Sequence, residues 1–98
     1  MIAIVDGGST KCDWVILDKF GKVFLKTETI GFNPNIIDSE MIVPEIEKNS
    51  NLLTIKDSLQ KVFFYGSGCG FPENVALVEN EFQKVFKNAE VTVKEDLT

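Results

Sequence analysis

The feature that most constrains this chain is the stretch IAIVDGGSTKCDWVIL, at residues 2–17. A short apolar run rich in β-branched residues predicts a strand over Ile2–Asp6 that is buried on both faces. Gly7-Gly8 predicts a tight turn, and a second strand is expected over Cys12–Asp18. The resulting hairpin brings a carboxylate, two glycines and two hydroxyl side chains to one end of a buried strand.

Three more strands are expected further along the chain. Lys22–Glu28 alternates between two faces, so it predicts a strand that completes an antiparallel meander. One face would hold Val23, Leu25 and Thr27, and the other Lys22, Phe24 and Lys26. Val62–Tyr65 predicts a hydrophobic strand that is broken by the following glycines, and residues 90–96 predict a last strand.

Two helices are expected between the later strands. The first would begin at Asp38 or Ser39. Its inward face would comprise Ile42, Ile46 and Met41. The second would follow Pro72, which suits an early helical position, and would end near Lys87 and Asn88. Its apolar stripe would comprise Val75, Val78, Phe82, Val85 and Phe86. Residues 49–60 have no clear pattern and predict a loop with a short helical turn.

This order of elements predicts the fold class. A strand reached through a crossover helix normally runs parallel to an earlier strand, through a right-handed connection. The expected fold is therefore α/β, a mixed five-stranded sheet with helices packed against it and the element order βββαβαβ. Its core is expected to contain Trp14, Phe63, Phe64, Phe82 and Phe86, with Cys12 and Cys69 as small buried hydrophobes.

Charge and composition argue against several kinds of partner and site. Ten lysines against 15 acidic residues give a formal net charge of −5. This balance argues against nucleic acid or a membrane as the main partner. There is no histidine, and Cys12 and Cys69 lack metal-ligand spacing. The apolar run that ends at Asp6 is too short for a signal sequence or a membrane span, so a cytoplasmic location is expected.

The turn after the first strand carries the residues with the clearest chemistry. It supplies, in order, Gly7, Gly8, Ser9, Thr10 and Lys11. Glycines allow positive φ and let backbone amides approach a ligand, while the hydroxyls and the lysine add donors. Asp6 is placed to hold a hydrated Mg²⁺ beside bound phosphates. An ordinary Gly-Gly hairpin is the alternative interpretation.

Three stretches carry a resemblance to a known family. DGGSTKCDWVILD, at residues 6–18, resembles the first phosphate motif of the actin, sugar-kinase and heat-shock-chaperone superfamily, and the element order matches its ribonuclease H-like domains. GFNPN, at residues 31–35, is similar to the substrate loop of N-acetylglucosamine-kinase-like proteins. FFYGSGCG, at residues 63–70, resembles a glycine-rich strand end of the same group, often named the BadF/BadG/BcrA/BcrD ATPase family.

The resemblance implies a set of roles. The cofactors would be ATP and Mg²⁺, with the metal positioned by Asp6 through water. The phosphate-binding residues would be Asp6, Gly7, Gly8, Ser9, Thr10 and, unless it only meets solvent, Lys11. The sugar-binding residues would be Asn33 or Asn35, Ser67 and Gly68. Asp96 would accept the proton of the attacking sugar hydroxyl. Without the resemblance, Asn33-Pro34-Asn35 is simply a turn and the glycines end a strand.

The resemblance also implies how the chain is organised. It covers residues 1–98 but corresponds to the amino-terminal ribonuclease H-like domain of a longer kinase, whose second domain and adenine-binding motif are absent from this sequence. The expected function of the full-length protein is ATP-dependent phosphorylation of N-acetylglucosamine or a related hexosamine. The isolated chain is expected to be inactive. The expected partners are a nucleotide and a small sugar, and a homodimer is left open.

Three alternatives remain at this point. Some relatives are ATPases that activate radical dehydratases or acyl-CoA reductases and bind an iron–sulfur cluster through cysteine. A ribonuclease H-like nuclease would use Asp6, Asp96 and other acids on two metal ions. The third alternative is a module without catalytic activity.

Overall fold

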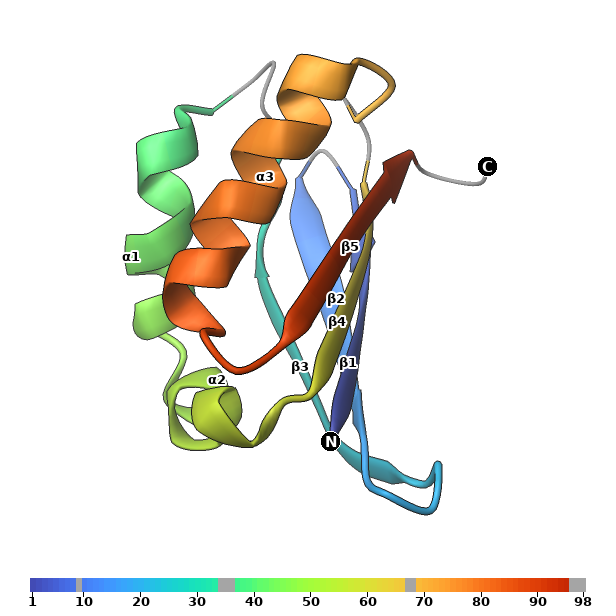
Figure 1. Ribbon diagram of the computed structural model, residues 1–98. Helices are drawn as coiled ribbons and strands as arrows, with labels where there is room; N and C mark the ends of the chain where they lie inside the picture. Colours follow the sequence, from blue (N-terminus) through green and yellow to red (C-terminus); the bar gives the residue numbers. More distant parts are fainter. Residues whose placement is uncertain (9, 34–36, 67–68, 96–98) are drawn as a thin grey trace.

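The computed structural model describes residues 1–8, 10–33, 37–66 and 69–95. Five strands form one sheet in the order β3-β2-β1-β4-β5 (Figure 1). They are β1 (Ile2–Gly7), β2 (Lys11–Leu17), β3 (Val23–Ile30), β4 (Lys61–Gly66) and β5 (Glu90–Glu95). Strand β2 is antiparallel to both of its neighbours, β1 and β3, whereas β1, β4 and β5 run parallel to one another. The predicted mixed five-stranded sheet is therefore confirmed.

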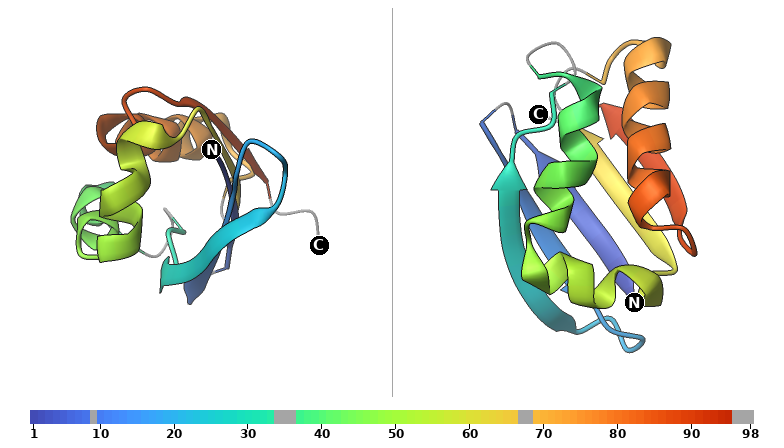
Figure 2. Two further views of the ribbon diagram at one scale, coloured as in Figure 1. Left: turned by 90° about the horizontal axis from the view of Figure 1, so that it is seen from below. Right: turned by 90° about the vertical axis from the view of Figure 1, so that its left-hand side faces the viewer.

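The helices lie together on one face of this sheet (Figures 1 and 2). They are α1 (Ile42–Glu47), α2 (Ser50–Ile55) and α3 (Pro72–Val85), with single 3₁₀ turns at Ser39–Met41 and Lys56–Ser58. The first two connect β3 to β4, and α3 connects β4 to β5. Within the described ranges, no helix is long and apolar enough to cross a bilayer.

The first helix begins differently from the prediction. A 3₁₀ turn starts at Ser39 and α1 itself starts at Ile42; the side chain of Asp38 makes no capping hydrogen bond. Pro44 falls in the first turn of α1, where a backbone N–H has no intrahelical partner to lose. Ile42 and Ile46 are buried as expected, but Met41 is 45% exposed, because the change of helix type rotates it away from the core.

The helix α2 lies where a short helical turn was expected within residues 49–60, but the sequence pattern did not define its bounds. Its start is fixed by Asn49, whose side-chain oxygen accepts a hydrogen bond from the Leu52 amide at 3.1 Å. Leu52, Ile55 and Leu59 are buried beneath it. The signal was present as an Asn-Ser pair before two apolar positions spaced three apart, but six residues are too few to show a clear period.

The third helix begins at Pro72 as predicted and ends at Val85, before Lys87 and Asn88. Of the predicted apolar stripe, Val75 is half-buried and the other members are buried. The helix therefore packs its stripe on the sheet, and it lies beside α1 (Figure 2).

The core between helices and sheet is largely aromatic. Phe82 of α3 stacks on Trp14 of β2 at a centroid distance of 5.6 Å and meets the ring edges of Phe64, Phe32 and Phe86. All five rings are at most 1% exposed. Such rings contribute burial of apolar area together with fixed ring geometry, so this cluster holds α3 against the central strands.

Two expectations about sheet faces were wrong. Phe63 lies on the face without helices and is only half-buried, because neighbouring residues of a strand point to opposite faces and Phe64 occupies the core. Val23 is 54% exposed, since the register between β2 and β3 shifts between Ile16 and Leu17. One inserted residue moves Val23 away from the face shared by its neighbours along β3.

Candidate functional site

One end of the sheet gathers the chain segments that carry the predicted site. The strand register aligns Thr29, Cys12, Gly7, Gly66 and Glu95 in one row across β3, β2, β1, β4 and β5. The turn after β1, the segment after β3, the loop after β4 and the end of β5 all leave the sheet next to this row. Loops at the carboxyl ends of parallel strands form the usual ligand site of an α/β sheet.

Two contacts join neighbouring loops at this end. The Gly31 amide donates a hydrogen bond to the Thr10 carbonyl at 3.1 Å, so the segment predicted to bind sugar starts against the turn predicted to bind phosphate. Gly70 lies beside the end of β5, because a Cβ added to Gly70 would stand 3.3 Å from the Glu95 Oε1 atom. The loops are therefore neighbours in space as well as in the strand register.

Asp6 lies at the end of the central strand with its side chain exposed. It stands between Asp13 of β2 and Tyr65 of β4 in the register. Its carboxylate forms no ion pair with another residue of the described ranges. Oxygen ligands of this kind are those that Mg²⁺ prefers, so the residue fits the metal role predicted for it.

Any cation at Asp6 would need further ligands. No three His, Cys, Asp or Glu side chains among the residues that the structure describes are grouped so that they could hold a metal ion. Mg²⁺ commonly keeps several waters and takes one or two carboxylates together with substrate phosphates. The chemistry of this site therefore suits a magnesium ion that arrives with a nucleotide.

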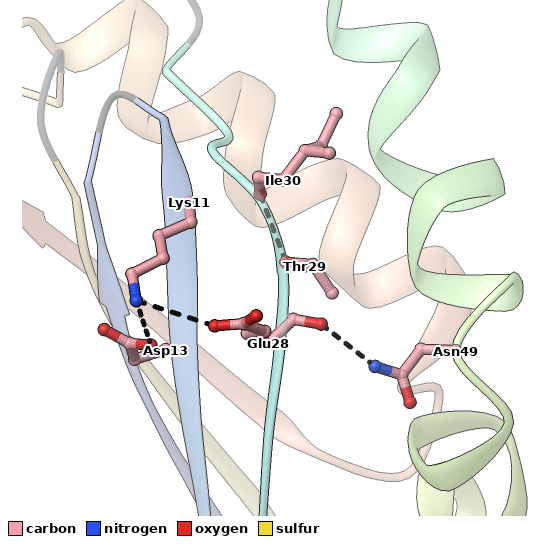
Figure 3. Close-up of polar contacts among 6 residues, drawn as sticks. All are labelled: Lys11, Asp13, Glu28, Thr29, Ile30 and Asn49. Atoms are coloured by element: carbon pink, nitrogen blue, oxygen red, sulfur yellow. Dashed lines mark hydrogen bonds and ion pairs between the residues drawn. The ribbon is translucent and has the colours of Figure 1, made fainter.

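Lys11 is turned toward two carboxylates that the sequence analysis did not single out. Its Nζ atom is 3.6 Å from Asp13 Oδ1 and 3.6 Å from Glu28 Oε2, and its side chain is 60% exposed (Figure 3). Ion pairs this exposed contribute little to stability. Lys11 can therefore exchange them for a phosphate at small cost. The only sequence signal for Asp13 and Glu28 was their alternation with inward-facing residues.

The two glycines of the turn lack the positive φ that was expected of them, and their contact with phosphate stays a prediction. Among the described residues, the only positive φ belongs to Gly21, so Gly7 and Gly8 do not supply a left-handed conformation. A Cβ on Gly8 would be a tight contact, 3.0 Å from the Lys11 carbonyl oxygen, which is the acceptor of the Gly8 amide at 2.9 Å. Gly7 faces the core, where a ring occupies the space of a side chain.

A polar groove of about 460 Å³ begins at the same turn. It is lined by Thr10, Lys11, Glu28, Thr29, Ile30, Glu45, Lys48 and Asn49. The Asn49 Nδ2 atom donates to the Glu28 carbonyl at 3.1 Å (Figure 3). It also donates to Thr27 Oγ1 at 2.8 Å, so Asn49 joins the start of α2 to the edge strand β3. Sequence patterns gave no reason to place Glu45 or Asn49 beside the turn, because this proximity arises only when α1 and α2 fold back over β3.

The remaining predicted site residues have separate outcomes. Asn33 is half-buried, and its carbonyl accepts a hydrogen bond from the Ile37 amide at 3.1 Å. Five lie outside the described residues, and their roles stay predictions: Ser9, Asn35, Ser67, Gly68 and Asp96.

Both cysteines are buried free thiols, as predicted. Burial raises the pKa of the Cys12 thiol to about 11 and also raises the pKa of Cys69. The thiolate is the form that binds metals and attacks electrophiles. Both side chains therefore behave as small apolar groups near neutral pH.

The comparisons with known proteins agree with this geometry. No family model and no curated protein sequence matches the chain. Among solved structures, the chain matches the "Putative N-acetylglucosamine Kinase" from Porphyromonas gingivalis with a TM-score of 0.83 and 31% sequence identity. The match covers 99% of this chain and 35% of the other, so the chain spans about a third of that protein's length. The similarity in fold and sequence confirms the resemblance to the N-acetylglucosamine-kinase-like family.

Proposed function

We propose that the protein carrying this chain is an ATP-dependent sugar kinase that phosphorylates N-acetylglucosamine or a related hexosamine. The observation that carries the proposal is the meeting of the turn at residues 7–11, the segment from Gly31 and the loop after Gly66 at one end of the sheet. The match to the protein described as a "Putative N-acetylglucosamine Kinase" supports a sugar kinase-like role.

The residues of the turn have the properties that nucleotide phosphates require. The Asp6 carboxylate and the Thr10 side chain are exposed, and the Thr10 hydroxyl can donate a hydrogen bond. The Lys11 ammonium lies within the same turn. Mg²⁺ bound with ATP would neutralise phosphate charge during transfer. Asp6 would hold that ion through water, and Thr10 and Lys11 would orient the phosphate oxygens.

The sugar would lie between the segment after β3 and the loop after β4. Phosphoryl transfer depends mainly on positioning and on neutralisation of charge, so the walls of such a site need hydrogen-bonding groups at fixed places. Asn33 is tied to Ile37 through its carbonyl, which fixes the start of this wall. Asp96 would take the proton of the attacking hydroxyl.

Calorimetry on the whole protein tests the proposal. We expect heat of binding with ATP and Mg²⁺ and with N-acetylglucosamine, and phosphorylated sugar when both are present. Glucose and an oligonucleotide serve as comparison ligands. Heat only with the oligonucleotide would overturn the proposal, and so would nucleotide binding with no phosphorylated sugar from any hexosamine. The 98-residue chain alone is expected to form no product.

A further inference from the structure

The side chain of Phe64 lies against two glycines on neighbouring strands. A Cβ built on Gly7 would stand 2.5 Å from Phe64 Cζ and 2.9 Å from Phe64 Cε2. A Cβ built on Gly66 would come closer still to Cε1 of the same ring. Gly7 and Gly66 are partners in the parallel register, so one ring fills the space of two missing side chains. The turn after β1 and the loop after β4 both start from these glycines.

The Phe64 ring is packed against other aromatic side chains of the core. Phe64 is 1% exposed, and its ring meets Phe82 edge to face at a centroid distance of 5.1 Å. Phe82 stacks on Trp14 and also contacts the edge of Phe32, the first buried residue after Gly31. Because interiors are close-packed, a ring enclosed in this way cannot turn aside without moving its neighbours. Its position is therefore fixed by the core rather than by either loop.

We propose that Phe64 is a positioning residue that couples the phosphate turn at residues 7–11 to the loop at Gly66–Gly70. The ring sets how closely the two glycine strand ends approach, and thereby the distance between the two loops. The ligands that would use this spacing, a nucleotide and a sugar, rest on the proposed function. The coupling itself rests only on the packing of the ring against the glycines.

Hydrogen exchange on the 98-residue chain tests the coupling. Two amides report on the loops: Gly8, which donates to the Lys11 carbonyl at 2.9 Å, and Cys69, which donates to the Gly66 carbonyl at 3.4 Å. In Phe64→Leu we expect both amides to exchange roughly tenfold faster through local opening. Phe64→Met, whose longer unbranched side chain can adapt to the space left by the ring, is the second variant if the leucine variant fails to fold.

Phe86→Leu is the matched control. Phe86 is fully buried and contacts Trp14 and Phe82, but it follows α3 at the opposite end of the sheet. The same substitution there removes the same atoms and should lower the melting temperature to a comparable extent. We expect the Gly8 and Cys69 amides to keep their protection in this variant. Faster exchange at only one of the two loops in Phe64→Leu, or equal effects in both variants, would overturn the coupling.

A rescue experiment tests the direct contact. Gly7→Ala should lower the melting temperature by roughly 15 °C, because its new methyl group meets the ring. Leucine lacks the Cζ and Cε atoms that this methyl group would meet. Phe64→Leu with Gly7→Ala should therefore melt about 4 °C or more above the sum of the single effects. Gly66→Ala should be rescued less, since a Cβ there would also lie 2.9 Å from Phe64 Cδ1. If the changes in melting temperature are strictly additive when Phe64→Leu is combined with Gly7→Ala and with Gly66→Ala, the direct contact is contradicted.

Kinetics of the whole protein separate this inference from the proposed function. Phe64→Leu should raise KM for ATP and for the sugar together, each by roughly tenfold, while Phe86→Leu leaves both unchanged. If the unaltered protein forms no phosphorylated sugar, the proposed function fails but the exchange and rescue results still decide the coupling. If the protein is a kinase and Phe64→Leu changes neither KM, the positioning role is overturned.

Discussion

The molecule contains two glycine turns between antiparallel strands, and they are built on different principles. The turn joining β2 to β3 projects from the far end of the sheet (Figure 1). Gly21 has φ of 78° there, and a Cβ on it would meet nothing within 4 Å. The Asp18 Oδ1 atom accepts hydrogen bonds from the Phe20 and Lys22 amides at 2.8 and 3.0 Å. This turn holds itself together with its own side chain.

The turn joining β1 to β2 depends on the rest of the fold. Its glycines have no positive φ. The ring of Phe64 comes too close to Gly7 for a Cβ, and the Lys11 carbonyl would make a tight contact with a Cβ on Gly8. Its carboxylate, Asp6, forms no ion pair among the described residues. The comparison teaches that a turn can be fixed from the core, which leaves its own polar side chains available for a ligand.

The largest expected difference between the two turns is in catalysis. Asp6→Asn in the whole protein should lower kcat by roughly a hundredfold or more, because the metal loses its charged anchor. Asp18→Asn should leave kcat unchanged, since that aspartate lies in the far turn. Steady-state kinetics together with thermal melts measure both effects. Normal turnover in Asp6→Asn, with the fold intact, contradicts the metal role.

Glycine replacement should distinguish the two physical requirements. Gly7→Ala is expected to cost about 3 kcal/mol of unfolding free energy, because the methyl group enters a filled core. Gly21→Ala should cost about 1 kcal/mol, the penalty for a left-handed conformation in open space. Urea unfolding of the 98-residue chain measures both. Equal losses would mean that the ring does not set the position of the first turn.

The buried thiol of Cys12, next to the first turn, should make the free energy of unfolding depend on pH. The pKa of Cys12 rises from 9.0 to about 11 because the thiol is buried. Between these values the unfolded chain loses the proton while the folded chain keeps it, so stability falls as pH rises, by on the order of 2 kcal/mol.

A matched variant isolates this contribution. Cys12→Ala removes the thiol, so the difference in unfolding free energy between this variant and the unaltered chain should shrink from pH 8 to pH 10.5. Lysine and tyrosine titrations are common to both proteins and cancel in the difference. A difference that stays constant with pH would show that the Cys12 thiol titrates alike in both states.

The smallest expected effect belongs to the far turn. Asp18→Ala removes the acceptor of two amides that lie at the surface, and should cost about 1 kcal/mol. Asp18→Asn keeps one oxygen acceptor and should cost less. Neither change should alter hydrogen exchange at Gly8. A loss of Gly8 protection in Asp18→Ala would mean that the two turns are not independent.

Much of the fold could be predicted because the signals are local. Strand Ile2–Gly7 and helix Pro72–Val85 were found from apolar period and flanking Gly and Pro, and the order of elements then gave the topology. Short or irregular elements were predicted less well. The six residues of α2 were expected only as a short helical turn without defined bounds, and the bulge that exposes Val23 leaves no mark in the pattern of β3.

For the candidate site, the sequence supplied the residue types and the structure supplied the neighbours. The motif around Asp6 indicated a phosphate turn, and this turn does lie beside Gly31 and Gly66 at one end of the sheet. The groove lined by Glu45 and Asn49 and the ion pair between Lys11 and Glu28 could not be predicted, because they join segments far apart in the chain.

Periodicity and turn chemistry act over a few residues, so the amino-acid pattern was enough to indicate which strands and long helix form and where a turn rich in glycine and hydroxyl groups interrupts them. The requirement for glycine at position 7 arises from the packed fold, because the ring of Phe64 comes from 57 positions later in the chain and reaches Gly7 through parallel pairing of β1 with β4. Close packing between distant segments has no local signature, and at this turn it replaces the backbone freedom that a glycine pair suggests.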